Sequence, residues 1–268
     1  MNRSGYVYLI AASALACGLA SAAQWNKAYN VTARPELRVE TNDGSVTINT
    51  WDEKRIEAVV TSRGWNIGSD VQVRERQIGD RVEIEAKVPS FHIEFLNFDE
   101  RWLRIELRVP RDTRTEVHTG DGSVEVNGLQ GEIRINTGDG SIRAARVGGV
   151  FDARTGDGSV HAQGRFESLD VHTGDGSVEV NADEGSHIAS AWRIETGDGS
   201  VKVGLPSRLA ADLDVRTGDG GLDVDLPLSM RTSTKNDDDH KELHGKLNGG
   251  GQPIYVRTGD GSVHIRSI

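Results

Sequence analysis

Short stretches in which apolar and polar residues alternate recur along the chain, on both sides of one five-residue sequence. Apolar residues stand two and four places before its first Thr and five and seven places after it, and the residues between them are mostly polar. Alternation with a period of two is typical of a half-buried β-strand. Thr-Gly-Asp-Gly-Ser begins at Thr119, Thr137, Thr155, Thr173, Thr196 and Thr258, with near-copies at Thr41 and Thr217. Each copy therefore predicts two short strands joined by a turn.

The turn must reset the alternation between inward and outward positions. The Thr shares the inner side with the apolar residues before it, yet simple alternation would send the apolar residue five places later outward. A corner within Gly-Asp-Gly-Ser resolves this conflict, because glycine permits either a positive φ or the close approach of another backbone segment. We expect the Asp carboxylate to hold the turn by accepting hydrogen bonds from the backbone N–H groups that follow it, as in an Asx turn.

The spacing of the copies indicates how the units are arranged. Successive copies from Thr119 to Thr173 begin 18 residues apart. A unit this short cannot bury its inner side alone, whereas stacked units pair each strand with its equivalent about 4.8 Å away. The alternative, an antiparallel sandwich of hairpins, requires neither a fixed period nor identical turns. The sequence therefore predicts an all-β fold, a single-stranded parallel β-helix (β-solenoid) with coils of 18 residues.

Two segments depart from this period. Between residues 52 and 110 the alternating stretches are longer, and a hairpin turn is expected at 77–80. We expect residues 24–112 to form an N-terminal β cap and a first coil, because open strand edges invite pairing with other chains. The regular coils are then expected at 113–268, with a mobile polar loop at 230–252.

These features resemble the bacterial DUF4097 family, whose members carry the label "putative adhesin". The resemblance rests on the Thr-Gly-Asp-Gly-Ser repeats, on Val-Pro-Arg-Asp-Thr at 109–113 and on His-Gly-Lys-Leu-Asn-Gly-Gly-Gly at 244–251, and it extends over residues 36–268. It implies a right-handed parallel β-helix, an exported or envelope location and no established biochemical activity.

The first residues have the pattern of a targeting segment. In residues 1–23, Arg3 precedes an apolar run, and small residues lead to a cleavage site before Gln24, as in a secretory signal peptide. We expect export of a single mature domain, 24–268, without a transmembrane span, to the periplasm or to the cell surface. The single cysteine, Cys17, lies in this segment, so a chain cut after Ala23 has no thiol. Lipidation of Cys17 is the alternative, although Leu15 stands one place too close to the cysteine for the usual signal.

Composition excludes several classes of protein. The net charge of −10 argues against nucleic-acid binding through phosphate contacts and against a polybasic membrane anchor. Glycine is abundant, with 32 residues, but it has no Gly-X-Y period, which excludes collagen. The expected partner is an envelope protein or a glycan. The sequence indicates no particular oligomeric state.

The Asp of each turn is the first candidate for chemistry. Stacking would place like charges in one row, and neighbours about 4.8 Å apart repel by about 1 kcal/mol even at the dielectric constant of water. Ca²⁺ could bridge them, but the chain lacks the nine-residue motif of calcium-binding β-rolls. We therefore expect turn hydrogen bonds and mobile counterions, with no bound metal and no cofactor. The residues in question are Asp121, Asp139, Asp157, Asp175, Asp198, Asp219 and Asp260.

Two further sets of residues could bind a partner. The outward positions one place before the Thr and six places after the Thr carry charges of both signs, which is typical of a solvated sheet face and would alternatively suit a recognition surface. An aromatic cluster within a short segment is either a small core under a loop or an exposed binding patch. Its members, the binding candidates that the sequence offers, are Phe91, Phe95, Phe98 and Trp102.

No catalytic residue is predicted. The chain has no G-x-S-x-G, H-E-x-x-H or Walker sequence. His240 and His244 would share a face if their segment were helical, as in some zinc sites, but nothing else there indicates a helix, so we expect ordinary loop residues.

Two functions follow from these observations. The first is an exported, non-enzymatic β-solenoid that serves as an adhesin-like or envelope interaction module. The second is a polysaccharide-active β-helix enzyme that resembles pectate lyases in architecture. An enzyme needs a concave pocket with convergent groups, and only 91–102 and 230–252 are long enough to wall one.

Overall fold

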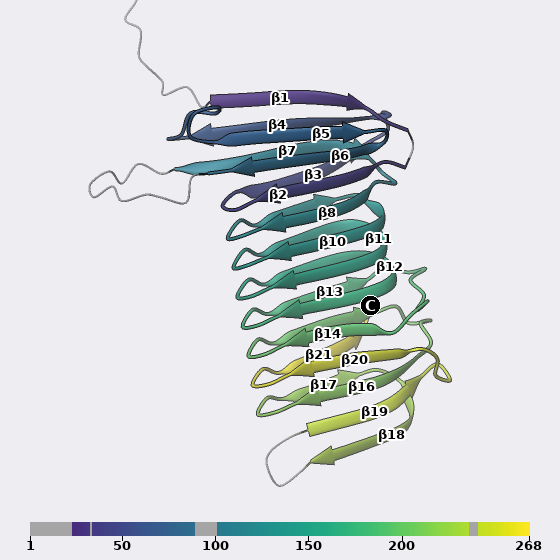
Figure 1. Ribbon diagram of the computed structural model, residues 1–268. Helices are drawn as coiled ribbons and strands as arrows, with labels where there is room; N and C mark the ends of the chain where they lie inside the picture. The colour runs from purple at the N-terminus through teal and green to yellow at the C-terminus, as the bar shows by residue number, and fades with distance from the viewer. Residues whose placement is uncertain (1–22, 33, 89–100, 236–240) are drawn as a thin grey trace, which may run out of the picture.

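The described part of the chain consists of β-strands and no helices (Figure 1). The computed structural model describes residues 23–32, 34–88, 101–235 and 241–268, with side chains omitted at 230, 231 and 233–235. All twenty-one strands belong to one continuous sheet. The prediction of an all-β fold is confirmed. The described residues include no helix with the length and hydrophobicity of a membrane-spanning segment.

Most strands lie in two parallel rows, one formed by the strands before the turns and one by the strands after them. The pre-turn row contains, in spatial order, β6 (Arg81–Lys87), β2 (Glu36–Thr41), β8 (Arg114–Thr119), β10 (Gln130–Thr137), the second halves of β11 (Ile142–Thr155) and β12 (Val160–Thr173), β14 (Trp192–Thr196), β20 (Pro253–Thr258) and β16 (Ala211–Thr217).

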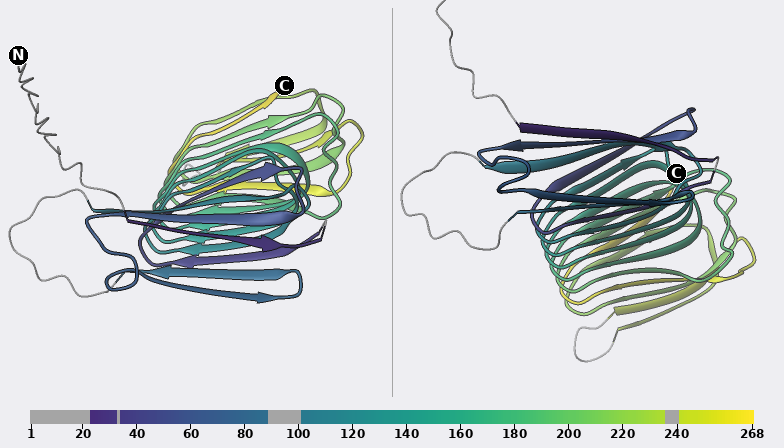
Figure 2. Two further views of the ribbon diagram at one scale, coloured as in Figure 1. Left: turned by 90° about the horizontal axis from the view of Figure 1, so that it is seen from above. Right: turned by 45° about the horizontal axis from the view of Figure 1, so that its top comes forward.

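The post-turn row runs beside it in the matching order. It contains β7 (Trp102–Pro110), β3 (Ser45–Trp51), β9 (Val124–Asn127), the first halves of β11 and β12, β13 (Val178–Ala182), β15 (Val201–Leu205), β21 (Val263–Ser267) and β17 (Leu222–Asp225). A turn with the Thr-Gly-Asp-Gly sequence or its variant joins one strand of each row into a unit, except for β6 and β7 at the N-terminal end, which follow the same arrangement without such a turn. The units lie over one another when the molecule is seen from above (Figure 2).

Antiparallel strands adjoin both ends of the rows. At the N-terminal end, β4 (Arg55–Arg63) pairs with β7 and β1 (Ala23–Asn30) pairs with β4, while β5 (Gln72–Ile78) pairs with β6. The predicted hairpin turn at 77–80 joins β5 to β6. At the other end, β19 (Lys241–Leu247) pairs with β16 and β18 (Leu228–Lys235) pairs with β19. The pre-turn row is therefore extended at its C-terminal end, whereas the post-turn row ends at β17.

The spatial order of the units differs from their order in the sequence. The last unit, β20–β21, lies between β14–β15 and β16–β17, with parallel pairing on both sides. In sequence order, β14–β15 is thus followed by β16–β17 two places further along the stack, and β20–β21 then lies between them. The first unit, β2–β3, is enclosed in the same way between β6–β7 and β8–β9. Each end of the stack therefore contains one inserted unit.

The turns are held by threonine rather than by aspartate. In the turn at Thr137, the hydroxyl accepts a hydrogen bond from Gly140 N at 3.2 Å and lies 3.1 Å from the carbonyl oxygen of Gly122 in the adjacent unit. A Gly N–H donates the same hydrogen bond to the Thr hydroxyl oxygen in the turns at Thr119, Thr155, Thr173, Thr196, Thr217 and Thr258. The expected Asx turn was therefore wrong, because the buried Thr hydroxyl already accepts from the N–H that closes the turn.

The turn glycines are required by the closeness of neighbouring turns. A Cβ built on Gly158 would lie 2.1 Å from the carbonyl oxygen of Gly140, which is far inside contact distance. These glycines are absent from the described residues that have a positive φ. Of the two reasons that the sequence left open, close backbone approach is the one that the structure supports.

The core is formed by ladders of inward side chains between the rows. The Thr of every turn is buried, as are the apolar residues on both sides of it except Leu222, which is partly buried. Aromatic residues widen the ladder in three neighbouring units, where the ring centroids of Phe151 and Phe166 lie 6.0 Å apart and those of Phe166 and Trp192 lie 6.2 Å apart. Each buried aliphatic side chain stabilises the fold by about 1.5–3 kcal/mol, so repetition of the ladder holds the units together.

The segment 230–252 differs from its prediction as a loop. Its described residues contribute most of β18 and all of β19, which form an antiparallel hairpin at the end of the pre-turn row. That part of the prediction was wrong, because Leu243 and Leu247 alternate with polar residues and are buried, so the segment has an apolar side to pack.

Candidate functional site

The outer face of the pre-turn row is covered by paired charges. The Arg154 guanidinium lies 2.7 Å from Asp152 and 3.6 Å from Asp170 of the next strand. Glu132 pairs with Arg114 and Arg134, and the Nε2 atom of His118 lies 2.7 Å from Glu116. The hydrogen bond with His118 lowers the pKa of the Glu116 carboxyl, against the opposing effect of its partial burial. These charged side chains therefore have partners of opposite sign on the same face.

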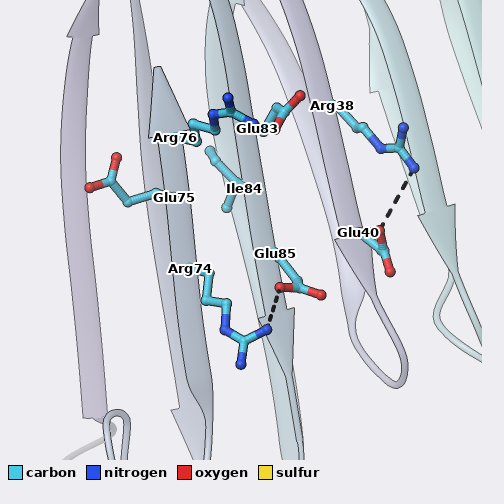
Figure 3. A pocket seen from close by; sticks show the side chains of 8 residues that line it. All are labelled: Arg38, Glu40, Arg74, Glu75, Arg76, Glu83, Ile84 and Glu85. Atoms are coloured by element: carbon cyan, nitrogen blue, oxygen red, sulfur yellow. Dashed lines mark hydrogen bonds and ion pairs between the residues drawn. The ribbon is translucent and has the colours of Figure 1, made fainter. Parts of the chain in front are cut away.

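A groove of about 350 Å³ on β2, β5 and β6 follows the same rule (Figure 3). Figure 3 shows Arg74 directed at Glu85 and Arg38 at Glu40, with distances of 3.5 and 3.9 Å. Lys87 also donates to Glu85, and this hydrogen bond lowers the pKa of the carboxyl. The acidic side chains of this groove have basic partners beside them. The groove therefore offers a ligand few free hydrogen-bonding groups and little uncompensated charge.

The outer face of the post-turn row, here called the post-turn face, is different. Three separate hollows of about 330, 290 and 430 Å³ follow one another along it. The first and second share Arg143, and the second and third share Glu179 and Asn181. The post-turn face is therefore a discontinuous trough that runs along the stack, across the strands.

A small residue lines each of the two hollows nearer the C-terminal end of the stack. Ala145 of β11 is exposed in the second hollow, whereas Gly204 of β15 borders the third but is buried under the side chains of Asn181 and Ile268. Around them stand exposed polar groups: Arg143, His161, Gln163, Lys202, His264 and Arg266. Few of these groups have an ionic partner among the described residues, and the closest pairs are His161 with Glu179 at 3.9 Å and His264 with Asp223 at 3.6 Å.

The turns that carry the Asp row lie along one edge of the stack (Figure 1). Its members are exposed, and the inserted unit places Asp260 between Asp198 and Asp219 rather than beyond them. Among the described residues, no three His, Cys, Asp or Glu side chains are grouped as a metal site would require.

The structure describes one of the four aromatic candidates. Phe91, Phe95 and Phe98 lie outside the described residues. Trp102 begins β7 and is half-buried, with the Arg104 guanidinium 5.0 Å from the centre of its ring. The role of the four as a binding site therefore remains a prediction.

The structure describes one member of the histidine pair. His240 lies outside the described residues, while His244 lies on β19, where its ring nitrogens are 3.8 Å from Asp214 and 3.7 Å from Glu242. The strand excludes the helical face that a zinc site of this spacing would use.

The sequence did not single out the post-turn face as the open one. The period of two identifies outward positions on both rows, but it does not reveal which carboxylates find cationic neighbours. Row order was a second obstacle, because the sequence order puts Asp223 before His264 while the structure reverses them. The long gap between Thr217 and Thr258 was the one signal that something unusual happens there.

Comparison with known proteins supplies a family. A family model described as Toastrack DUF4097 matches residues 34–266. No curated protein matches the chain.

Solved structures of low identity also match. A "putative cell adhesion protein" from Clostridium sporogenes is 12% identical, with 92% of this chain and 100% of that chain covered and a TM-score of 0.41. A "putative adhesin" from Parabacteroides merdae is 11% identical, with 91% and 96% covered and a TM-score of 0.46. One from Bacteroides fragilis is 12% identical, with 93% and 99% covered and a TM-score of 0.35. Because these scores lie below 0.5, family membership rests on the family model.

Proposed function

The chain belongs to the Toastrack DUF4097 family, and on this basis we propose that it is an exported, non-enzymatic β-solenoid that serves as an adhesin-like or envelope interaction module. Its mature form would begin after Ala23 and act in the periplasm or at the cell surface. Its partner would be an envelope protein or a glycan.

The stacking of the units supports the solenoid part of the proposal. Equivalent strands of neighbouring units pair in parallel and in register, and the turns other than the one at Thr41 are bonded to the adjacent turn through their Thr hydroxyl. At the N-terminal end, β1, β4 and β5 are antiparallel additions that would act as the cap, since they occupy the edges on which another chain could pair.

The observation that carries the interaction role is the contrast between the two outer faces. The pre-turn face pairs most of its charges internally, whereas the hollows of the post-turn face are bordered by the exposed Gln163, the half-buried Asn181 and charged groups with few ionic partners among the described residues. A long, open polar surface on a rigid scaffold suits an extended partner better than a small substrate. The names of the solved relatives point to the same class of role.

Two measurements on the full chain test this proposal. Expression in a bacterial host followed by fractionation should place the protein outside the cytoplasm, and mass spectrometry should find the mature N-terminus at Gln24 rather than a lipidated Cys17. Purified mature protein should then bind isolated cell envelopes without releasing reducing ends from envelope polysaccharides. Retention in the cytoplasm, or depolymerisation of a polysaccharide that stops when hollow-lining residues are changed, would overturn it.

A further inference from the structure

We propose that the post-turn face carries two copies of one binding site, three units apart, which together hold a neutral, hydroxyl-rich linear polymer lying along the stack. This inference rests on the proposed interaction role and names the chemistry of its partner.

The first observation is a repeat in side-chain type along the row six places after the turn Thr. In spatial order the residues are acidic, basic, histidine, acidic, basic, histidine and acidic. The strand register aligns them directly, from β9 to β17. The row reads Glu125, Arg143, His161, Glu179, Lys202, His264 and Asp223. The sequence order hides this repeat, because the inserted unit brings His264 between Lys202 and Asp223.

The neighbouring outward row repeats with the same step. Eight places after the turn Thr, an Asn is followed by a small residue and then by a long polar one, twice over. The residues are Asn127, Ala145 and Gln163, then Asn181, Gly204 and Arg266. The two places are not identical, because Ala145 is exposed whereas Gly204 is covered by the side chains of Asn181 and Ile268. A register shift after Ala144 also interrupts this row. The correspondence of the hollows of about 290 and 430 Å³ therefore rests on the charged row and its contacts.

The contacts within the two copies also correspond. In the first copy the His161 ring lies 3.9 Å from the Glu179 carboxylate of the next strand. In the second copy the His264 ring lies 3.6 Å from the Asp223 carboxylate, which occupies the equivalent place. Each hollow therefore has a basic residue on one side and a histidine–acid pair on the other side.

The pre-turn face lacks this pattern. Its row one place before the turn Thr carries, in spatial order, Glu40, His118, Asn136, Arg154, His172, Glu195, Arg257 and Arg216, without a three-unit repeat. The repeat is thus a property of one face and not of the units themselves.

The spacing indicates a polymer. Strands lie about 4.8 Å apart, so three units separate equivalent points by about 14 Å. A ligand that meets both copies must repeat its own groups over that length or a fraction of it. An extended peptide would instead find its backbone partners at a strand edge, because the face of a sheet has no free N–H or C=O groups to pair.

The charges decide the chemistry of that polymer. Both signs recur within each copy, so a polyanion would meet a carboxylate at every third unit and a polycation would meet a guanidinium or an ammonium group. A neutral polymer of hydroxyl groups meets neither penalty. Carboxylate, amide and guanidinium groups each present two adjacent acceptors or donors, and a hydroxyl group can donate and accept, so adjacent hydroxyls can be bound in pairs. A linear neutral glycan has this chemistry.

The test uses purified mature protein and size series of malto-, cello- and chito-oligosaccharides, with polygalacturonate and polylysine as charged comparators. Titration calorimetry should show that one neutral series binds, with affinity rising steeply once the chain spans the two hollows, because the second contact becomes intramolecular. His161→Ala or His264→Ala alone should each weaken the long probe by about tenfold and abolish the steep rise, and the double variant should not bind.

The matched control is His172→Ala on the pre-turn face, where His172 lies 3.9 Å from Glu195 in the same kind of pair. It should bind like the unchanged protein, and all variants should keep the same melting temperature. A second variant, Ala145→Trp, fills the exposed floor of one hollow without removing a polar group and should reproduce the effect of His161→Ala.

Several results would overturn the proposal: no neutral series binds, a charged comparator binds more tightly than every neutral one, affinity rises without a step, or the post-turn variants bind like His172→Ala. If isolated envelopes are still bound in any of these cases, the general interaction role stands and only the assignment of the polymer fails.

Discussion

The two outer faces of this molecule are made from the same units, yet they treat charge in opposite ways. On the pre-turn face, Glu132 lies against two arginines and Arg154 against two aspartates, so charge contributes to cohesion between units. On the post-turn face, Glu125 and Arg143 stand exposed beside hollows. In a repeated scaffold, the charges of one surface can therefore stabilise the contacts between units, while the other surface stays open for binding.

The largest expected effect comes from a change that breaks both faces together. Gly158→Val would place a Cβ 2.1 Å from the Gly140 carbonyl oxygen and force the turns apart, so the free energy of unfolding should fall by more than about 3 kcal/mol. Urea denaturation followed by circular dichroism measures it. The control is Ser159→Ala at the next, outward position, which should unfold like the unchanged protein. Equal unfolding midpoints for all three would show that turn contact is unimportant.

A smaller effect should separate the faces directly. Glu132→Gln removes the carboxylate shared by Arg114 and Arg134 and should lower the free energy of unfolding by about 1 kcal/mol at low salt, and by less at high salt. Glu125→Gln removes an acid that has no ion pair among the described residues, and it should change stability by less than about 0.5 kcal/mol. Equal losses for both variants would contradict the comparison.

Acid should weaken the pre-turn face first. A hydrogen bond with His118 lowers the pKa of Glu116 below its ordinary value of 4.5, so this carboxylate stabilises the fold above about pH 4.5 and loses its contribution as the pH falls through the lowered pKa. Unfolding midpoints measured across this range should fall with decreasing pH, and less steeply for Glu116→Gln. Parallel curves for the two proteins would exclude this contribution.

The smallest effect is expected at the turn edge, which belongs to neither face. A chelator should leave the melting temperature unchanged, because no described group of acidic residues is arranged as a metal site. Asp157→Asn should alter it only slightly, and toward greater stability at low salt, since it removes one exposed member of a like-charged row. A loss of many degrees with chelator, restored by Ca²⁺, would instead assign the row to calcium.

Much of this fold could be predicted from local pattern, and the reasons are physical. Alternation around each Thr-Gly-Asp-Gly turn fixes which residues are buried, because a strand has two sides and only one faces the core. The longer strands between 52 and 110 were visible for the same reason. The resemblance to DUF4097 is confirmed by the family model.

What the sequence could not provide concerns relations between distant residues. Whether Thr or Asp closes a turn depends on the carbonyl group of the adjacent unit, which the local sequence does not contain. The place of β20–β21 depends on its pairing with β14–β15 and β16–β17, and the local sequence does not specify this pairing. The open face was missed for this reason, since its repeat exists only in the spatial order.

The insertion of the last unit has a consequence for how the chain is made. Because β20–β21 completes hydrogen bonding for the units on both sides, the stack cannot close until residues 253–268 have been synthesised. A chain without residues 253–268 would leave the facing edges of β14–β15 and β16–β17 without backbone partners. One segment thus joins two parts of the stack, and its removal should loosen both of them at once.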